Sequence, residues 1–166
     1  MKIACYIGNH AKDGLSIRLG WAITRLVQRG RWAQVTHMEA IHAEHADGSV
    51  DIASASLREG GVRVKRQVHL APGNWQIIDV PAWPLERSQE LLQLTLGHPY
   101  DVRGAIASAL PLFKPSPTRW FCNEWVAAPF IEESWQFGPA STVALAITAG
   151  GFDVTEPFNQ KRHHVT

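Results

Sequence analysis

Two glycine-containing turns, each set between segments of alternating polarity, constrain the fold of this chain most strongly. Asp47 and Gly48 read as a hairpin turn, and Glu59, Gly60 and Gly61 read as a second one. Such short turns join antiparallel neighbours. The middle of the chain is therefore predicted to be an antiparallel meander. Its strands are residues 35–43, 50–57, 62–70 and 75–80.

The pattern changes from strands to helices in the second half of the chain. Residues 2–8 form an apolar opening strand that contains Cys5, and residues 16–28 have helical spacing. The remaining predicted helices cover residues 85–96, 100–110, 122–130 and 141–149. The polar tail, residues 159–166, is expected to be loose. Together these elements predict an α+β fold in a single domain, residues 1–166.

The charge balance argues against nucleic acid as a partner. Lys and Arg total 16 against 15 Asp and Glu, so an electrostatic footprint for phosphates is missing. The basic cluster from Arg58 to Arg66 is interpreted as the solvated face of a strand pair. Neither a signal peptide nor an apolar run long enough to span a membrane is recognised. The expected location is cytoplasmic, or phage-associated, or reached by another export route.

The segment from Arg119 to Trp125 places Cys122 at the start of a predicted helix, behind aromatic residues and a proline-rich loop. The helix dipole and the unpaired N–H groups at a helix N-terminus stabilise a thiolate, which is the nucleophilic form of cysteine. A reactive thiol is one interpretation. The other is a small buried side chain without chemistry, which is common for free cysteines.

Histidine is the usual general base for such a thiol, and His37 is the best candidate of the eight histidines. It lies inside a predicted strand, and Glu39, two residues on, shares its side of the pleat. A carboxylate there can orient the imidazole through an N–H contact. The alternative is a partly buried histidine that Glu39 satisfies without any catalytic role.

A metal site is a further interpretation of the same region, which is dense in ligand types: His37, Glu39, His42, Glu44 and His45. His42 is predicted on the opposite face of the strand, and His45 in the turn, so one zinc ion is hard to reach by all three histidines. No metal and no other cofactor is expected.

Three short motifs, in this order, carry a family resemblance. They are Thr36-His37-Met38-Glu39, then Tyr100-Asp101 with Gly104, then Trp120 to Trp125 around Cys122. This arrangement resembles the permuted branch of the NlpC-type, papain-like cysteine peptidases, which includes YiiX-like proteins and relatives of lecithin retinol acyltransferase. In that branch the histidine strand precedes the cysteine helix. The chain departs from the usual family pattern at Thr36, Met38 and Asn123, which bears on substrate fit.

The resemblance implies a circularly permuted papain-like fold, with an antiparallel β-meander or barrel packed against helices. It implies Cys122 as nucleophile, His37 as general base and Glu39 as third member, with backbone N–H groups forming an oxyanion hole. Ser56 is a rival third member, because a hairpin centred on Asp47 and Gly48 would set it opposite Glu39.

The implied activity is that of a thiol hydrolase that cleaves amide bonds, peptide or isopeptide, with peptidoglycan peptides of bacteria as the favoured substrate. Trp120, Trp32 and Tyr100 are the predicted substrate-binding residues. An acyltransferase or thioesterase acting on lipid acyl groups is the alternative, and a non-catalytic binding module on the same fold is another. The sequence does not determine the oligomeric state.

Overall fold

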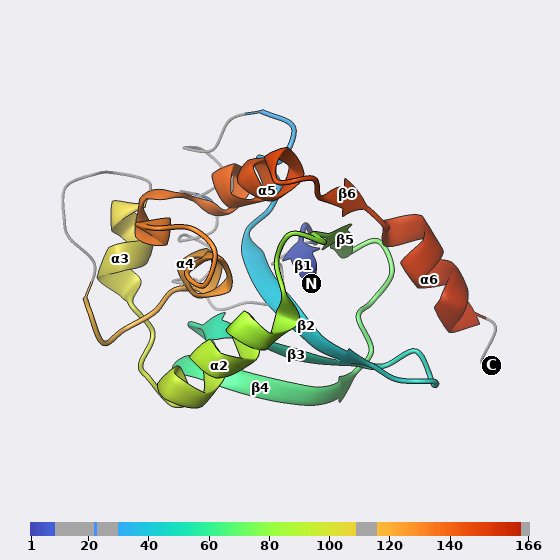
Figure 1. Ribbon diagram of the computed structural model, residues 1–166, viewed down its shortest axis with the longest axis horizontal. Helices are drawn as coiled ribbons and strands as arrows, with labels where there is room; N and C mark the ends of the chain where they lie inside the picture. The colour runs from blue at the N-terminus through green and yellow to red at the C-terminus, as the bar shows by residue number, and fades with distance from the viewer. Residues whose placement is uncertain (9–21, 23–29, 109–115, 164–166) are drawn as a thin grey trace.

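An antiparallel sheet forms the centre of the computed structural model of the protein, which describes residues 1–8, 22, 30–108 and 116–163 (Figure 1). Its order is β4-β3-β2-β1-β5-β6. The strands in that part of the chain are β1 (Lys2–Tyr6), β2 (His37–Glu44), β3 (Val50–Ser56), β4 (Gly61–Val68), β5 (Trp75–Asp79) and β6 (Phe152–Asp153). The predicted α+β class is thereby confirmed as an antiparallel sheet packed against helices.

The helices lie mostly after the strands in sequence, as predicted. They are α2 (Leu85–Thr95), α3 (Val102–Ala107), α4 (Cys122–Ala127), α5 (Pro139–Thr148) and α6 (Thr155–His163), with a short 3-10 turn η1 (Ser134–Gln136). The helix predicted over residues 16–28 falls outside the described residues, apart from Ala22. None of the described helices is both long and apolar enough to cross a membrane.

The prediction that β5 extends the meander is wrong, because β5 pairs with β1 and not with β4. β1 pairs on its other side with β2, so it is hydrogen-bonded along both edges. This central place leaves Ile3, Ala4 and Cys5 with no exposed surface. The apolar opening strand therefore has its backbone groups satisfied by two partners, as burial requires.

A β-bulge alters the predicted register of the β2–β3 hairpin. Glu44 pairs with Val50, but the register shifts between Ile41 and Ala43, so that Ala40 pairs with Ala53. Continuing that register places Ser54, not Ser56, opposite Glu39. The expected pairing of Ser56 with Glu39 is wrong for two reasons. The turn pairs Glu44 with Val50, where a hairpin centred on Asp47 and Gly48 would pair Glu44 with Asp51, and the bulge shifts the register by one residue more.

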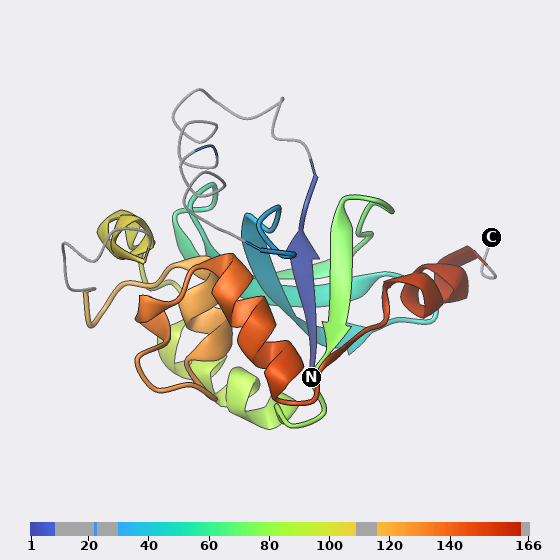
Figure 2. The same ribbon diagram turned by 90° about the horizontal axis from the view of Figure 1, so that it is seen from above.

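α4 and α5 lie at one side of the sheet and α6 at another (Figure 2). Each face of the sheet has its own apolar cluster. On one face α4 and α5 bury Trp125, Val126 and Val143 against β1 and β2. On the other face α6 buries Phe158, which is 6% exposed, against Ile41 and other residues of the sheet.

The tail is helical as far as His163, contrary to the expectation of a loose segment from residue 159 on. Two contacts explain the helix. Asp153 accepts hydrogen bonds from the Thr155 backbone N–H, at 2.9 Å, and from its hydroxyl, at 2.6 Å, just before the first turn. Phe158 then fixes the helix against the sheet. Residues 164–166 lie outside the described residues.

Between α2 and α4 the backbone passes very close to the first residues of β4. The segment after α2 runs beside the start of β4, where the Val62 N–H donates to the His98 carbonyl at 2.8 Å. Gly61 permits this contact, because a Cβ there would lie 2.0 Å from the His98 oxygen. A bridge between Tyr100 and Trp120 then leads into α4.

Candidate active site

Cys122 is the first residue of α4, a helix whose six residues are all buried. The thiol is 3% exposed. Its Sγ lies 3.8 Å from Oδ1 of Asn123, whose amide nitrogen donates to the Phe137 carbonyl. Trp125 anchors the helix, because its Nε1 donates to the Thr95 hydroxyl of α2 at 2.9 Å.

His37 opens β2 and contacts Glu39 as predicted from the pleat. Its Nε2 lies 2.8 Å from Oε1 of Glu39. The His37 side chain is 16% exposed and that of Glu39 is 3% exposed. The pair is therefore largely removed from water, where charge interactions are strong.

The thiol of Cys122 and the imidazole of His37, 85 positions apart in sequence, meet in the fold. Burial lowers the pKa of His37, but the Glu39 charge, the sulfur of Cys122 and hydrogen bonds from both side chains raise it to about 10. The fold therefore places His37 between a sulfur and a carboxylate, and both groups favour the protonated form of the imidazole.

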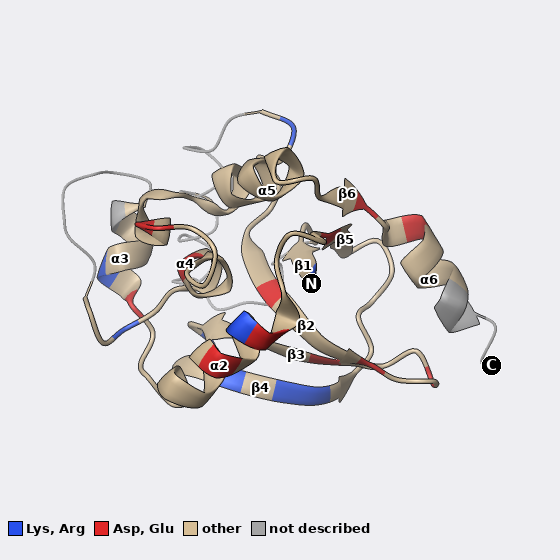
Figure 3. Cartoon of the chain, viewed as in Figure 1, with Lys and Arg blue, Asp and Glu red and all other residues tan. Residues whose placement is uncertain are grey.

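Arg63 of β4 is the partner of Glu39 that sequence reasoning missed. Its Nη1 donates to Oε2 of Glu39 at 2.6 Å, and its Nη2 donates to Oε1 at 2.5 Å. Burial raises the pKa of Glu39, but His37 and Arg63 outweigh it and lower that pKa. The interpretation of the cluster from Arg58 to Arg66 as a solvated face is wrong for Arg63, whose side chain is 14% exposed. Figure 3 marks in blue the positions of basic residues along β4.

Ser56, the rival third member, is 6% exposed and lies at the end of β3. Its hydroxyl hydrogen-bonds the carboxylate of Glu59. Burial raises the pKa of Glu59, yet hydrogen bonds from Lys65 and Ser56, with the charges of Arg63 and Lys65, lower it to about 2. The contact to His37 is made by Glu39.

A second acid lies behind the thiol, in the first turn of α4. Glu124 is 6% exposed and accepts a hydrogen bond from the Phe121 backbone N–H at 3.2 Å. Burial, with the nearby charge of Asp101, raises the pKa of Glu124 to about 8, although the Phe121 hydrogen bond opposes the change. Glu124 thus caps the helix, as its position in the first turn suggests.

A pocket of about 190 Å³ opens beside His37 and Glu39. Its described lining is Tyr6, His37, Glu39, Ile52, Ser56, Leu57, Arg58, Glu59, Arg63, Lys65, Val68, Trp75 and Tyr100. Aromatic rings and charged side chains thus share one concave surface, which suits a ligand with both apolar and polar parts.

Of the three predicted substrate-binding residues, Tyr100 lines this pocket, whereas Trp32 and Trp120 are not among its described lining. Trp32 is 9% exposed and belongs to the core cluster under the helices. Trp120 donates from Nε1 to Nδ1 of His98 at 3.3 Å. Both tryptophans therefore have structural contacts in the fold.

The three histidines that a metal site would use have different partners in the fold. Nε2 of His42 is 3.0 Å from the Ser88 hydroxyl of α2, and Nε2 of His45 is 2.8 Å from Oδ1 of Asp51. Within the described residues, His, Cys, Asp and Glu form no group of three or more that could hold a metal ion.

Cys5 lies in β1 and has no exposed surface. Burial, which is the main cause, raises the pKa of its thiol well above the ordinary value. Cys5 is thus a packed apolar side chain, and a useful internal reference for Cys122.

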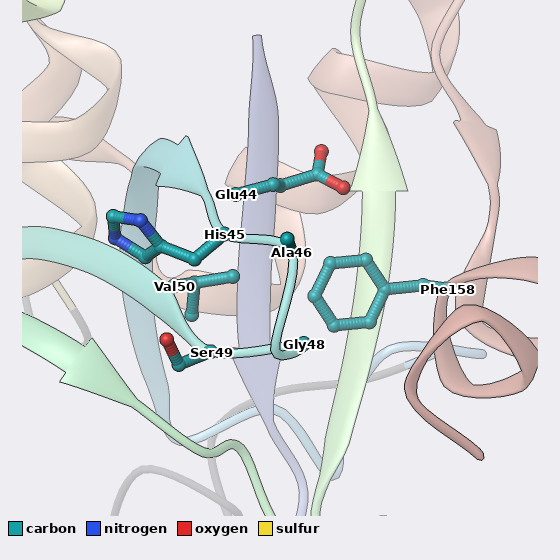
Figure 4. Close-up of a pocket in the computed structure, with 7 residues that line it drawn as sticks. All are labelled: Glu44, His45, Ala46, Gly48, Ser49, Val50 and Phe158. Atoms are coloured by element: carbon teal, nitrogen blue, oxygen red, sulfur yellow. The ribbon is translucent and has the colours of Figure 1, made fainter. Parts of the chain in front are cut away.

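A further pocket, of about 310 Å³, lies between the β2–β3 turn and α6 (Figure 4). The Phe158 ring faces the turn across it, and Glu44 and His45 stand on its strand side. Cys122, His37 and Glu39 do not line it.

No family model matches the chain, and neither a curated protein nor a solved structure matches it.

Proposed function

We propose that the protein is a thiol hydrolase that cleaves amide bonds through a Cys122–His37 pair, with Glu39 as the third member. One observation carries this function: the His37 imidazole contacts the Cys122 thiol and, through Nε2, Glu39. A sulfur, an imidazole and an orienting carboxylate in a row are the groups that nucleophilic acyl transfer uses. The motif resemblance agrees, so a permuted papain-like arrangement is part of the proposal.

Acylation starts from the ion pair in which the Cys122 proton has already moved to the imidazole. Because Nε2 is occupied by Glu39, the remaining ring nitrogen, Nδ1, holds that proton. The thiolate then attacks the carbonyl carbon, and the negative oxygen is bound by backbone N–H groups at the start of α4, which have no partners within the helix. The C–N bond breaks, and His37 returns the proton to the departing amine.

Deacylation reverses these roles with water. His37 removes a proton from water, the hydroxide attacks the thioester carbonyl, and the C–S bond breaks. The acid product departs, and the thiol is regenerated. Glu39 stabilises the imidazolium in both halves of the reaction, which is the task of the third member in such sites.

The pocket beside His37 is the proposed place for the substrate, with Tyr100 on its wall. Peptide and isopeptide amides are the substrate class, and peptides of peptidoglycan are the favoured members by the motif resemblance. Transfer of lipid acyl groups shares every chemical step up to the thioester, so the acceptor and the acyl donor separate the two activities.

Alkylation by iodoacetamide tests the pair directly. Near pH 6 an ordinary thiol, with a pKa of about 8.5, is almost entirely protonated and reacts slowly. We expect the wild-type protein to react at this pH at least about tenfold faster than free cysteine, because the imidazolium favours the thiolate. Cys122→Ser abolishes the modification, His37→Ala slows it by a similar factor, and Cys5→Ala, the matched control, leaves it unchanged.

Modification at the rate of free cysteine, indifferent to His37→Ala, would remove the activated pair and favour a binding module. With the pair established, turnover of peptidoglycan fragments, isopeptides and acyl esters identifies the substrate. Release of free acid from amides but not from lipid esters is the expected result. The reverse preference would make the protein an acyltransferase or thioesterase.

A further inference from the structure

Arg63 belongs to β4, a strand with several basic residues, but its side chain binds an acidic residue two strands away. It is paired with Ser54 of β3 in the register, and its side chain crosses β3 to reach Glu39 on β2. Both terminal nitrogens bind Glu39, one to each carboxylate oxygen. Two parallel contacts of a planar guanidinium fix the plane of a carboxylate, which a single point charge does not do.

Arg63 is itself held from the other side. Its Nε donates to Oε2 of Glu59 at 3.3 Å, and Oε1 of Glu59 accepts from Nζ of Lys65 at 2.5 Å. Charges of alternating sign therefore follow one another from the imidazole to the edge of β4. The order is His37, Glu39, Arg63, Glu59 and Lys65.

One oxygen of Glu39 connects the arginine to the imidazole. Oε1 of Glu39 accepts from Nη2 of Arg63 and also contacts Nε2 of His37. If the carboxylate turns about its last side-chain bond, the contact to the imidazole is lost. Arg63 blocks that rotation, because it binds both oxygens at once.

We infer that Arg63 is a positioning residue of this site: it holds Glu39 in the orientation that aims His37 at Cys122. The inference rests on the proposed function and adds a fourth participant to it. Arg63 acts through Glu39 and His37 and makes no contact with the reacting atoms in this mechanism. A purely structural Arg63 would neutralise a buried carboxylate, affecting stability but not the reactivity of the thiol.

Alkylation of Cys122 near pH 6 separates these two roles. We expect Arg63→Gln to slow the reaction by roughly tenfold to a hundredfold, as small misplacements of a reacting group do. Glu39→Gln should slow it to a similar extent. The double variant should be no slower than either single one, because both changes remove the same orientation. Arg66→Gln is the matched control: Arg66 lies on the same strand, but its side chain is 80% exposed, and the rate should stay within about twofold.

Arg63→Lys keeps the charge but not the two parallel contacts, so it tests positioning even if Arg63→Gln fails to fold. We expect it to retain the wild-type far-ultraviolet circular dichroism spectrum and to react several-fold more slowly. Wild-type rates in Arg63→Lys and Arg63→Gln would overturn the inference, as would losses that simply add to that of Glu39→Gln.

The two proposals fail in different ways. If His37→Ala slows alkylation and Arg63→Gln does not, the Cys122–His37 pair stands and the role of Arg63 is purely structural. If neither variant slows it, both proposals fall together.

Discussion

The pKa of His37 depends on two neighbouring side chains, Glu39 and Cys122. Burial alone would favour the neutral imidazole, but Glu39 and Cys122 reverse that preference and raise the pKa of His37 to about 10. The folded protein therefore binds this proton more tightly than the unfolded chain does. Its contribution to stability is complete below the ordinary histidine pKa of 6.5 and is lost as the pH rises through about 10.

Removing the charge of Glu39 should release this proton at a lower pH. In Glu39→Gln the pKa of His37 should fall clearly, because the Glu39 charge is the largest cause that raises it. Nuclear magnetic resonance titration of labelled histidine measures the change, and urea unfolding between about pH 6 and pH 10 should show a smaller loss of stability in the variant. An unchanged His37 titration would contradict the assigned electrostatic contact.

At the level of elements, the first turn of α4 combines a cap with a buried acid. Glu124 accepts from the Phe121 N–H, yet its carboxyl group lies out of water and near Asp101. Asp101 is itself 3% exposed and accepts from the N–H groups of Gly104 and Ser116, each at 2.9 Å. Glu124 is therefore harder to ionise in the folded protein than in the unfolded chain. Its ionisation lowers the free energy of unfolding.

Replacing Glu124 with glutamine should stabilise the protein in a pH-dependent way. The amide oxygen can still accept from Phe121, while the ionisation penalty disappears. That penalty is absent below the ordinary pKa of 4.5, grows up to about pH 8, and is constant above it. We expect Glu124→Gln to raise the unfolding free energy by on the order of 3 kcal/mol near pH 8.5, and by much less near pH 5.

Chemical denaturation at the two pH values measures this difference. Glu86→Gln is the matched control, because Glu86 also lies in the first turn of a helix, α2, but is exposed. Its effect should stay within about 0.5 kcal/mol. Equal stabilisation by Glu124→Gln at both pH values would mean that Glu124 ionises normally.

The whole molecule depends on two separate apolar layers, one on each face of the sheet. The first joins α4 and α5 to β1 and β2, and so holds the helix of Cys122. The second joins α6 to the opposite face through Phe158. Figure 2 shows α6 at the far end of the sheet from α4. The helix that carries Cys122 and the tail helix α6 therefore pack against different parts of the core.

Truncating Phe158 should weaken the fold without altering the site. Phe158→Ala removes a ring that is 6% exposed and should cost about 3–5 kcal/mol of unfolding free energy. The alkylation rate of Cys122 in the folded variant should match that of wild type. Phe152→Ala is the control, since Phe152 is 52% exposed and should cost less than about 1 kcal/mol. Slow alkylation in a folded Phe158→Ala protein would mean that the two layers are coupled.

The pair of His37 and Glu39 was predictable because it is local. Two residues apart on one strand, they share a face whatever the strand pairs with, and the contact at 2.8 Å follows. Arg63 was not predictable in the same way. Its approach to Glu39 depends on the register of three strands, and a bulge between Ile41 and Ala43 changes that register. The misplacement of Ser56 comes from this bulge together with a turn register that differs by one residue from the predicted one.

The amino-acid sequence by itself determined the types of most described elements, the glycine turns, the burial of Cys5 and the side of β2 on which His37 and Glu39 lie. These properties follow from periodicity and turn chemistry, which act over a few residues. Only the tertiary structure decided that β5 pairs with β1, that α6 packs against the sheet, that Arg63 binds Glu39 and that Cys122 meets His37. Each of these joins segments distant in sequence, and such contacts are selected by backbone hydrogen bonding and packing across the whole chain, which local patterns do not encode.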